Sequence, residues 1–305
     1  MNSTPTSTPH AISTAATRRA LVLGGGGSTG NAWLIGVLAG LADAGLHVTD
    51  ADVVIGTSAG ATAAAQITGA APAGLYAAVL DTPPQPTAPP GSGHGPAPVR
   101  PVSDHLERTA RIIAASEDAA DMRRRMGALA LDLAAAHDGS RRWRETVAGR
   151  LPGPDWPQHT LLITAVDAHT GEPEVFDRTS GIDLVDAVAA SCASGFAYGI
   201  GGRRYIDGGY RRNENADLAA GCGRVLVLSP FGGRTRMPLE WGAQLEAQVD
   251  ELRSAGSRVE TICPDPGSEH LFGANAMDIS LRPAAARAGY SQGKDLAAEL
   301  TNFWR

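Results

Sequence analysis

Two short motifs carry residues that could perform acyl transfer, and the first contains a serine. Ser58 lies at the centre of Gly56-Thr-Ser-Ala-Gly60, directly after the apolar run Asp52–Ile55 and before a helix of small residues. A serine between a strand and a helix needs a strained turn, which small neighbours permit, and its hydroxyl is then exposed beside a helix N-terminus. This context predicts a nucleophile, although the pattern alone also fits Ser58 as an ordinary helix N-cap.

The predicted nucleophile needs a base, and Asp207 is the better of two candidates. It ends a short strand, Arg203-Arg-Tyr-Ile-Asp207, and two glycines follow it that let its backbone approach another segment closely. Burial raises the pKa of an aspartate, which can then accept the serine proton in place of histidine. Asp-Gly-Gly is also a common tight turn. A histidine base in the usual order of serine, acid and histidine would have to be His270, which lies in a polar loop.

A second glycine cluster, Gly24 to Gly30, also follows an apolar strand, Ala20–Leu23, and opens a helix. Its backbone N–H groups can converge on an anion or a developing oxyanion, and the same glycines also allow close packing of a helix on a strand. The cluster contains the dinucleotide spacing Gly25-x-Gly27-x-x-Gly30. The second strand, however, ends in Gly56-Thr-Ser58 rather than in the acid that would bind a ribose. No Gly-Lys-Ser/Thr follows the glycines, which excludes a nucleoside-triphosphate loop.

A repeated strand–turn–helix unit positions these motifs and predicts parallel strands joined by helical crossovers. We expect further strands at Leu161–Val166, Arg203–Ile206, Arg224–Leu228 and Val259–Cys263, and further helices at Val185–Ala193, Leu239–Ser254 and Arg282–Phe303. Val53 to Leu80 is uncharged, but its small residues, Gln66 and Pro72 favour a buried strand, turn and helix over a membrane span.

The segment from residue 81 to residue 150 interrupts this rhythm. Eight of the 21 residues from Asp81 to Pro101 are proline, and Asp104 to Ala136 has the apolar periodicity of one or two amphipathic helices. We therefore expect residues 81–150 to form a Pro-rich and helical cap-like insertion over the active site. A purely structural excursion or a disordered loop fits the same pattern.

Composition defines the class of protein. The chain has 305 residues, of which 43% are apolar, enough for one large α/β domain. A net charge of −6 without a basic block argues against nucleic-acid binding. Three widely spaced cysteines predict neither a disulfide framework nor a zinc site, and no calcium-binding spacing is present. Residues 1–19 lack the pattern of a secretory signal and are expected to be a disordered leader, which makes the cytoplasm the expected compartment.

Three motifs occur in one order, Gly24–Gly30, Gly56–Gly60 and Asp207-Gly-Gly209, and together they make residues 20–300 resemble the bacterial patatin-like phospholipase family. Ala190-Ser-Cys-Ala193 adds to the resemblance. The fold that it implies is a three-layer α/β/α sandwich with a mainly parallel central sheet and a helical insertion. Residues 20–305 would form this single domain.

The resemblance implies a serine acyl hydrolase that cleaves carboxylic ester bonds of lipids. Ser58 would be the nucleophile and Asp207 its base, and the backbone amides of Gly25, Gly26 and Gly27 would bind the oxyanion. The implied partner is a lipid or acyl-ester substrate, and the chemistry requires neither a metal nor a cofactor. Transient contact with a membrane surface and the oligomeric state are left open.

Two positions depart from the family's pattern. Thr29 stands where Arg or Lys commonly precedes the last glycine of the first motif, which puts a preference for anionic headgroups in doubt. Ser194-Gly195 stands where proline commonly follows Ala-Ser-x-Ala-x, which is expected to reshape the pocket wall. Two other functions fit the motifs, namely a histidine-based esterase of the ordinary α/β-hydrolase kind and a module that binds an acyl or phosphate group without turnover.

Overall fold

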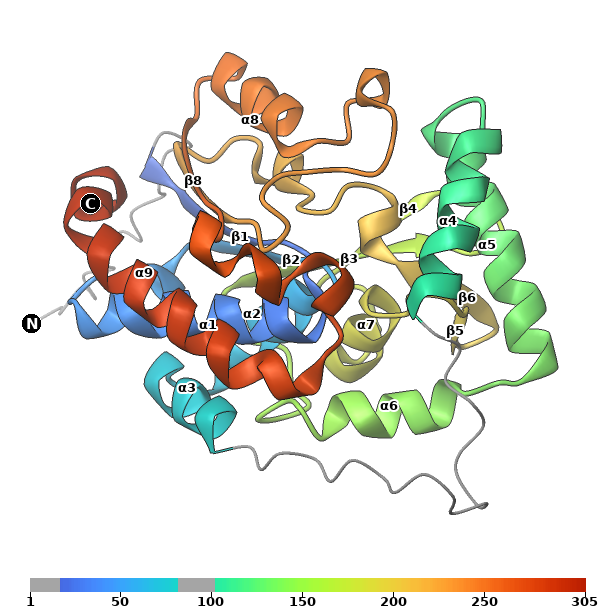
Figure 1. The fold of residues 1–305 in the computed structure, drawn as a ribbon, viewed down its shortest axis with the longest axis horizontal. Helices are drawn as coiled ribbons and strands as arrows, with labels where there is room; N and C mark the ends of the chain where they lie inside the picture. Colours follow the sequence, from blue (N-terminus) through green and yellow to red (C-terminus); the bar gives the residue numbers. More distant parts are fainter. Residues whose placement is uncertain (1–16, 82–101) are drawn as a thin grey trace, which may run out of the picture.

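The centre of the molecule is an eight-stranded sheet, seen in a computed structural model that describes residues 17–81 and 102–305 (Figure 1). The strands are β1 (Arg19–Leu23), β2 (Val53–Gly56), β3 (Thr160–Asp167), β4 (Pro173–Phe176), β5 (Tyr198–Ile200), β6 (Arg203–Asp207), β7 (Arg224–Leu228) and β8 (Arg258–Ile262). Hydrogen-bonded neighbours follow the path β5-β6-β3-β2-β1-β7-β8, in which β2 and β6 pair with successive parts of one edge of β3 and β4 pairs with its other edge. Strands β3, β2, β1, β7 and β8 pair in parallel, which confirms the mainly parallel sheet.

Strand residues alternate between two faces, and helices cover both. Leu21 and Leu23 of β1 belong to one hydrophobic core, whereas Ala20 and Val22 belong to a second core on the opposite face. The first face packs against α1 (Gly27–Asp43), α2 (Ala59–Gly69), α7 (Leu184–Ser191) and α9 (Arg282–Trp304). The second packs against α8 (Leu245–Ser254) and α5 (Ala119–Ala136). This is the predicted three-layer α/β/α arrangement.

Helices α1 and α9 lie side by side and approach each other backbone to backbone (Figure 1). Gly36 and Gly40 of α1, and Gly289 and Gly293 of α9, each face a backbone carbonyl of the other helix. A Cβ atom at any of these four positions would overlap with that carbonyl oxygen. The two glycines are four residues apart on both helices, so each pair lies on the helix face that meets its partner.

The expected insertion forms three helices, and one of them belongs to the core. These are α4 (Val102–Ala115), α5 and α6 (Ser140–Ala148), while residues 82–101, which hold all eight prolines of the insertion, lie outside the described residues. Met122 and Met126 of α5 are buried against Val166 and Ile206 of the sheet. Helix α5 therefore has a structural role in the core, the alternative to a cap that the sequence pattern also fits.

The predicted elements are confirmed, with differences at particular residues. Leu239–Ser254, expected as one helix, contains a 3-10 turn at Leu239–Trp241 and then α8, because Gly242 adopts a φ of 63° that ends the turn. Residues 53–80 form β2, α2 and a further helix, α3 (Pro72–Leu80). Residues 1–16 of the expected leader lie outside the described part of the chain. Among the described helices, none combines the length and apolarity that crossing a membrane requires.

Candidate active site

Strands β2 and β6 bring Ser58 and Asp207 together by running toward each other along one edge of β3. Ile163 of β3 pairs with Gly56 of β2 on this edge and with β4 on the other edge. Ala165 pairs with Asp207 of β6 and, on the opposite edge, with β4. Parallel β2 and antiparallel β6 therefore meet end to end at neighbouring positions of β3. The register of this one strand determines how close the two side chains lie.

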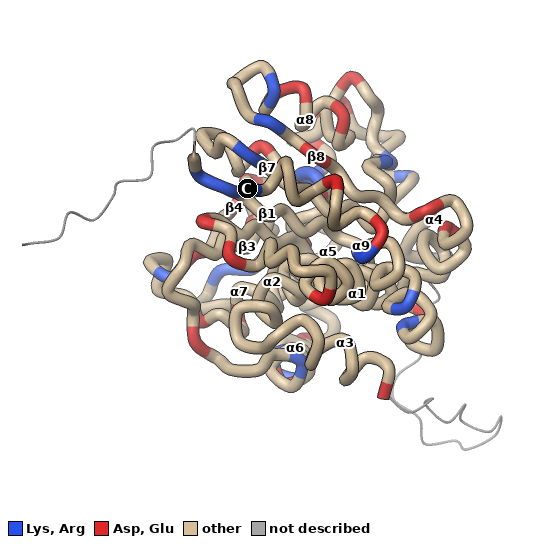
Figure 2. Tube along the Cα trace, turned by 90° about the vertical axis from the view of Figure 1, so that its left-hand side faces the viewer, with Lys and Arg blue, Asp and Glu red and all other residues tan. Residues whose placement is uncertain are grey.

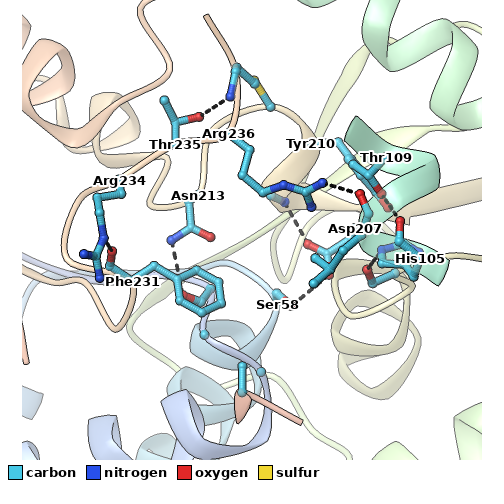
Figure 3. Close-up of a pocket in the computed structure, with 18 of the residues that line it drawn as sticks. Ser58, His105, Thr109, Asp207, Tyr210, Asn213, Phe231, Arg234, Thr235 and Arg236 are labelled. Atoms are coloured by element: carbon cyan, nitrogen blue, oxygen red, sulfur yellow. Dashed lines mark hydrogen bonds between the residues drawn. The ribbon is translucent and has the colours of Figure 1, made fainter. Parts of the chain in front are cut away.

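Ser58 and Asp207 form a hydrogen-bonded pair (Figure 3). Ser58 Oγ donates to Asp207 Oδ2 at 2.8 Å, and the Gly209 N–H donates to Asp207 Oδ1 at 2.8 Å. Asp207 is 7% exposed, and its burial raises its pKa to about 6, although both hydrogen bonds act to lower it. A carboxylate with this pKa is ionised at neutral pH and is a stronger base than an exposed aspartate. It can therefore accept the serine proton.

The backbone of Ser58 is strained, as the sequence predicted. Its φ of 53° and ψ of −115° are rarely adopted by residues with a side chain. Small neighbours permit this turn, since a Cβ at Gly56 would lie 2.6 Å from the Ala61 Cα and one at Gly60 would overlap with the Leu23 carbonyl. The Ser58 side chain makes no capping hydrogen bond to α2, so it does not act as an N-cap.

Three consecutive residues at the end of α7 contact both members of the pair. The Ser58 N–H donates to Ser191 Oγ at 2.9 Å, and Cys192 Sγ donates to the Ser58 carbonyl at 3.1 Å. The Asp207 N–H donates to the Ala193 carbonyl at 3.1 Å. Burial raises the pKa of the Cys192 thiol to about 12, which keeps it protonated as a donor and prevents it from acting as a nucleophile. The segment thus fixes the strained serine and the aspartate relative to each other.

The glycine loop borders the same pocket, and its amides differ in availability. The Gly25 N–H donates to the Asn213 carbonyl at 3.0 Å, and Asn213 Nδ2 donates back to the Gly25 carbonyl at 3.2 Å. The Gly25 amide is therefore engaged within the protein. The amides of Gly26 and Gly27 have no acceptor in residues 17–81 and 102–305, and they lie where α1 begins. Of the three predicted oxyanion donors, these two are free.

A buried carboxyl group supports the glycine loop through Asn213. Asn213 Nδ2 donates to Glu214 Oε1 at 2.8 Å, and Ser229 Oγ donates to the same oxygen at 2.7 Å. Burial raises the pKa of Glu214, which is 1% exposed. Sequence reasoning missed Asn213 because it holds Gly25 partly through its backbone carbonyl, which no residue pattern reports.

A pocket of about 290 Å³ opens at the serine–aspartate pair. Its lining residues come from the glycine loop, from α4, from the segment after β7 and from the segment before α9 (Figure 3). His105, Leu106 and Thr109 of α4 lie in this lining. Part of the expected insertion therefore reaches the site, whereas α5 mainly supports the sheet.

The other sequence candidates lie elsewhere. His270 is exposed and is not part of the pocket lining. The histidine that lines the pocket is His105, which sequence reasoning passed over because no motif marks its helix. Thr29 is buried and its N–H donates to the Ala276 carbonyl at 3.0 Å. Across the described residues, no three His, Cys, Asp or Glu side chains gather into a group able to hold a metal ion.

Comparison with known proteins identifies the family. Residues 21–220 match the model of the patatin-like phospholipases, and these are 200 of the 305 residues. The chain belongs to the patatin-like phospholipase family. This membership supports lipid-ester hydrolysis as the general activity, and it confirms the fold that the three motifs implied. Strand β8, helix α8 and helix α9 follow the part that matches the patatin-like model.

Solved structures provide two further similarities. VipD from Legionella pneumophila is 14% identical with a TM-score of 0.41, and the match covers 93% of this chain and 67% of VipD. The structure of full-length SpcU in complex with full-length ExoU from Pseudomonas aeruginosa matches at 15% identity with a TM-score of 0.38. That match covers 94% of this chain and 53% of the other, so this chain spans about half of its length. No curated protein matches.

Proposed function

We propose that this chain is a serine acyl hydrolase that cleaves carboxylic ester bonds of lipids through a dyad of Ser58 and Asp207. The observation that carries the proposal is the 2.8 Å hydrogen bond from a strained serine hydroxyl to a buried carboxylate, beside two free backbone amides. Membership of the patatin-like phospholipase family supports the class of substrate. The apolar part of the pocket lining, which includes Phe231, Ala276 and Met277, suits an acyl chain.

In the acylation step, Ser58 Oγ attacks the ester carbonyl carbon while its proton passes to Asp207 Oδ2. The carbonyl oxygen becomes an oxyanion, which the amides of Gly26 and Gly27 and the N-terminus of α1 stabilise. A well-placed donor contributes about 3 kcal/mol in other acyl-transfer enzymes. As the bond to the alcohol breaks, Asp207 returns the proton to the leaving oxygen, and the acyl group remains on Ser58.

In the deacylation step, water takes the place of the alcohol. Asp207 accepts a proton from the water as its oxygen attacks the acyl carbonyl, and the same two amides bind the second oxyanion. The proton then returns to Ser58 Oγ as the acyl–serine bond breaks. Ser191 and Cys192 hold the serine backbone in place through both steps.

A fluorophosphonate probe and an ester panel test this proposal in parallel. Wild type should be labelled at Ser58 and should hydrolyse acyl esters or phospholipids. Ser58→Ala or Asp207→Asn should lower hydrolysis by several orders of magnitude, and the double variant should be little worse, because paired catalytic residues are far from additive. His270→Ala is the matched control and should keep wild-type activity.

The alternatives predict opposite results in the same assays. Substantial activity in Asp207→Asn together with loss in His270→Ala would support the histidine-based esterase. Failure of the probe to label Ser58 in folded wild type, with no hydrolysis of any ester, would support a module that binds without turnover.

A further inference from the structure

The pocket has two chemically different sides. Phe231, Ala276 and Met277 form an apolar side next to the glycine loop, where the Cβ position at Gly27 lies 3.0 Å from the Ala276 Cβ. Arg234 lies beside Phe231, and its guanidinium is paired with Glu269 at 3.5 Å. The other side, the polar side, carries the polar groups of His105, Ser194, Tyr210 and Arg236. Apolar side chains from the same segments, Leu106, Ile113, Met122 and Met237, also line the pocket. In Figure 3, Phe231 lies on one side of Ser58, while Tyr210 and His105 lie on the other with Asp207.

Arg236 extends over the polar side with most of its donors unused (Figure 3). Arg236 Nη2 donates to the Leu106 carbonyl of α4 at 2.7 Å, which directs the guanidinium across the pocket. Arg236 forms no ion pair with any carboxylate in the described part of the chain. An arginine has five N–H donors, so several are available to a ligand. Its positive charge acts on both His105 and Tyr210.

His105, Ser194 and Tyr210 form a polar cluster beside this guanidinium. His105 Nε2 lies 3.3 Å from Ser194 Oγ, and Ser194 is close enough to the Tyr210 hydroxyl to act on its pKa. Burial lowers the pKa of His105, and the charges of Arg108 and Arg236 lower it further. Two guanidinium groups therefore face this histidine and make the region electropositive.

The departure from the family pattern at Ser194-Gly195 makes room for this cluster. Gly195 has a φ of 89°, which proline cannot adopt. A Cβ at Gly195 would lie 3.1 Å from His105 Nδ1, closer than an ordinary contact. Ser194 supplies the hydroxyl that bonds His105. The unusual dipeptide thus both supplies a polar group and allows α4 to approach.

The direction of the reaction places the alcohol portion of the substrate on this polar side. Asp207 returns its proton to the leaving oxygen, so the alcohol must depart next to Asp207. Tyr210 lies three residues after Asp207. Burial raises the pKa of Tyr210, and the nearby Asp207 carboxylate raises it further. The acyl group is left to the apolar side, next to the glycine loop.

We propose that Arg236, His105 and Tyr210 bind a negatively charged group, such as a phosphodiester, on the alcohol portion of the substrate. This inference rests on the proposed function and names the charge of its substrate. Asp207 is the sole carboxylate in the lining of this pocket among the described residues. Elsewhere acidic and basic residues are interspersed along the trace, within a chain of net charge −6 (Figure 2). The cation that Thr29 does not supply comes instead from the segment after β7.

The test compares two soluble esters that differ in charge and share their acyl chains. Wild type and variants hydrolyse 1,2-dihexanoylphosphatidylglycerol or neutral 1,2-dihexanoylglycerol below their critical micelle concentrations, and kcat/KM is measured for each. Wild type should favour the charged ester by about tenfold or more, since a charge-assisted hydrogen bond contributes about 10- to 100-fold in affinity. The ratio should fall toward one in Arg236→Gln and by a few-fold in Tyr210→Phe. Arg287→Gln, an exposed position on α9 outside the pocket, should keep the wild-type ratio.

The outcomes separate this inference from the proposed function. Hydrolysis of both esters with a ratio near one, or an unchanged ratio in Arg236→Gln, would overturn the anion subsite and leave the hydrolase intact. If wild type hydrolyses neither ester, the proposed function fails, and calorimetric titration with sn-glycerol 3-phosphate then tests the subsite without turnover. Weaker binding in Arg236→Gln than in wild type supports it, and absence of binding to wild type overturns it. Thermal melts establish that each variant is folded.

Discussion

Asp207→Asn should make the protein more stable at pH 8 while it abolishes hydrolysis. The pKa of Asp207 is about 6 in the folded protein against an ordinary value of 3.8, because burial disfavours the charged carboxylate. This difference corresponds to about 3 kcal/mol of folding free energy at about 1.4 kcal/mol for each pH unit. Asparagine has the same shape and carries no charge. Its amide oxygen can still accept the Gly209 N–H, and its NH₂ can donate to Ser58.

The sign of this effect depends on pH. Below pH 3.8 both the folded and the unfolded state hold the proton of Asp207, so burial costs nothing. Between pH 3.8 and about 6 the unfolded state releases its proton first, and wild-type stability falls as pH rises. Above about 6 both states are ionised and the full cost of about 3 kcal/mol persists. The variant avoids this loss.

Urea unfolding of wild type and Asp207→Asn from about pH 4 to pH 8 measures the difference directly. The advantage of the variant should grow from near zero to about 3 kcal/mol, and the comparison cancels groups that titrate equally in both proteins. Asp167→Asn is a control of opposite sign. Burial raises the pKa of Asp167, but hydrogen bonds from Thr170, His169 and Arg203 outweigh it and hold the pKa below its usual value. An Asp207→Asn variant less stable than wild type at pH 8, or a difference independent of pH, would refute the reasoning.

Four other predictions follow from the site. Wild-type kcat/KM should rise about tenfold per pH unit up to about 6 and then level, since Asp207 must be ionised; a flat profile between pH 4 and 8 would contradict this role. Ser191→Ala leaves the nucleophile's N–H unpaired and should lower kcat about tenfold with little change in KM, and Ser191→Thr should restore it. Gly26→Val should abolish turnover in a folded protein, since its Cβ would lie 2.5 Å from the Pro230 side chain; unchanged turnover would place the oxyanion donors elsewhere. Met122→Ala should cost about 2–5 kcal/mol in urea unfolding, and a smaller loss would mean that α5 is not part of the core.

The parts of the site that could be predicted from the sequence are local. A strand, a sharp turn and a helix of small residues identify Ser58 as a candidate nucleophile, because the turn requires small residues directly next to Ser58 in the sequence. The same holds for Gly26 and Gly27 at the start of α1. The engagement of the Gly25 amide could not be foreseen, because its acceptor is the backbone carbonyl of Asn213, nearly two hundred residues away.

The relation between the strands that carry Ser58 and Asp207 could not be predicted from local sequence patterns either. The repeated unit predicts parallel strands, yet β6 runs against β2 and meets it along β3. Only the register of β3 determines this meeting, and register is a property of three paired strands together. The position of His105 could not be predicted for a similar reason. A long insertion brings α4 to the pocket, and the periodicity of a helix does not show which part of the protein the helix packs against.

The contact between α1 and α9 makes α9 important for the geometry of the site, although α9 contains none of the three sequence motifs. The free amides of Gly26 and Gly27 stand at the first turn of α1, so their direction follows the axis of that helix. Helix α9 fixes this axis through contacts that do not tolerate even one methyl group. A shortened or fused protein that keeps residues 20–220 and omits α9 would keep Ser58, Asp207 and the glycine loop, but it would lack the helix that orients the two amides.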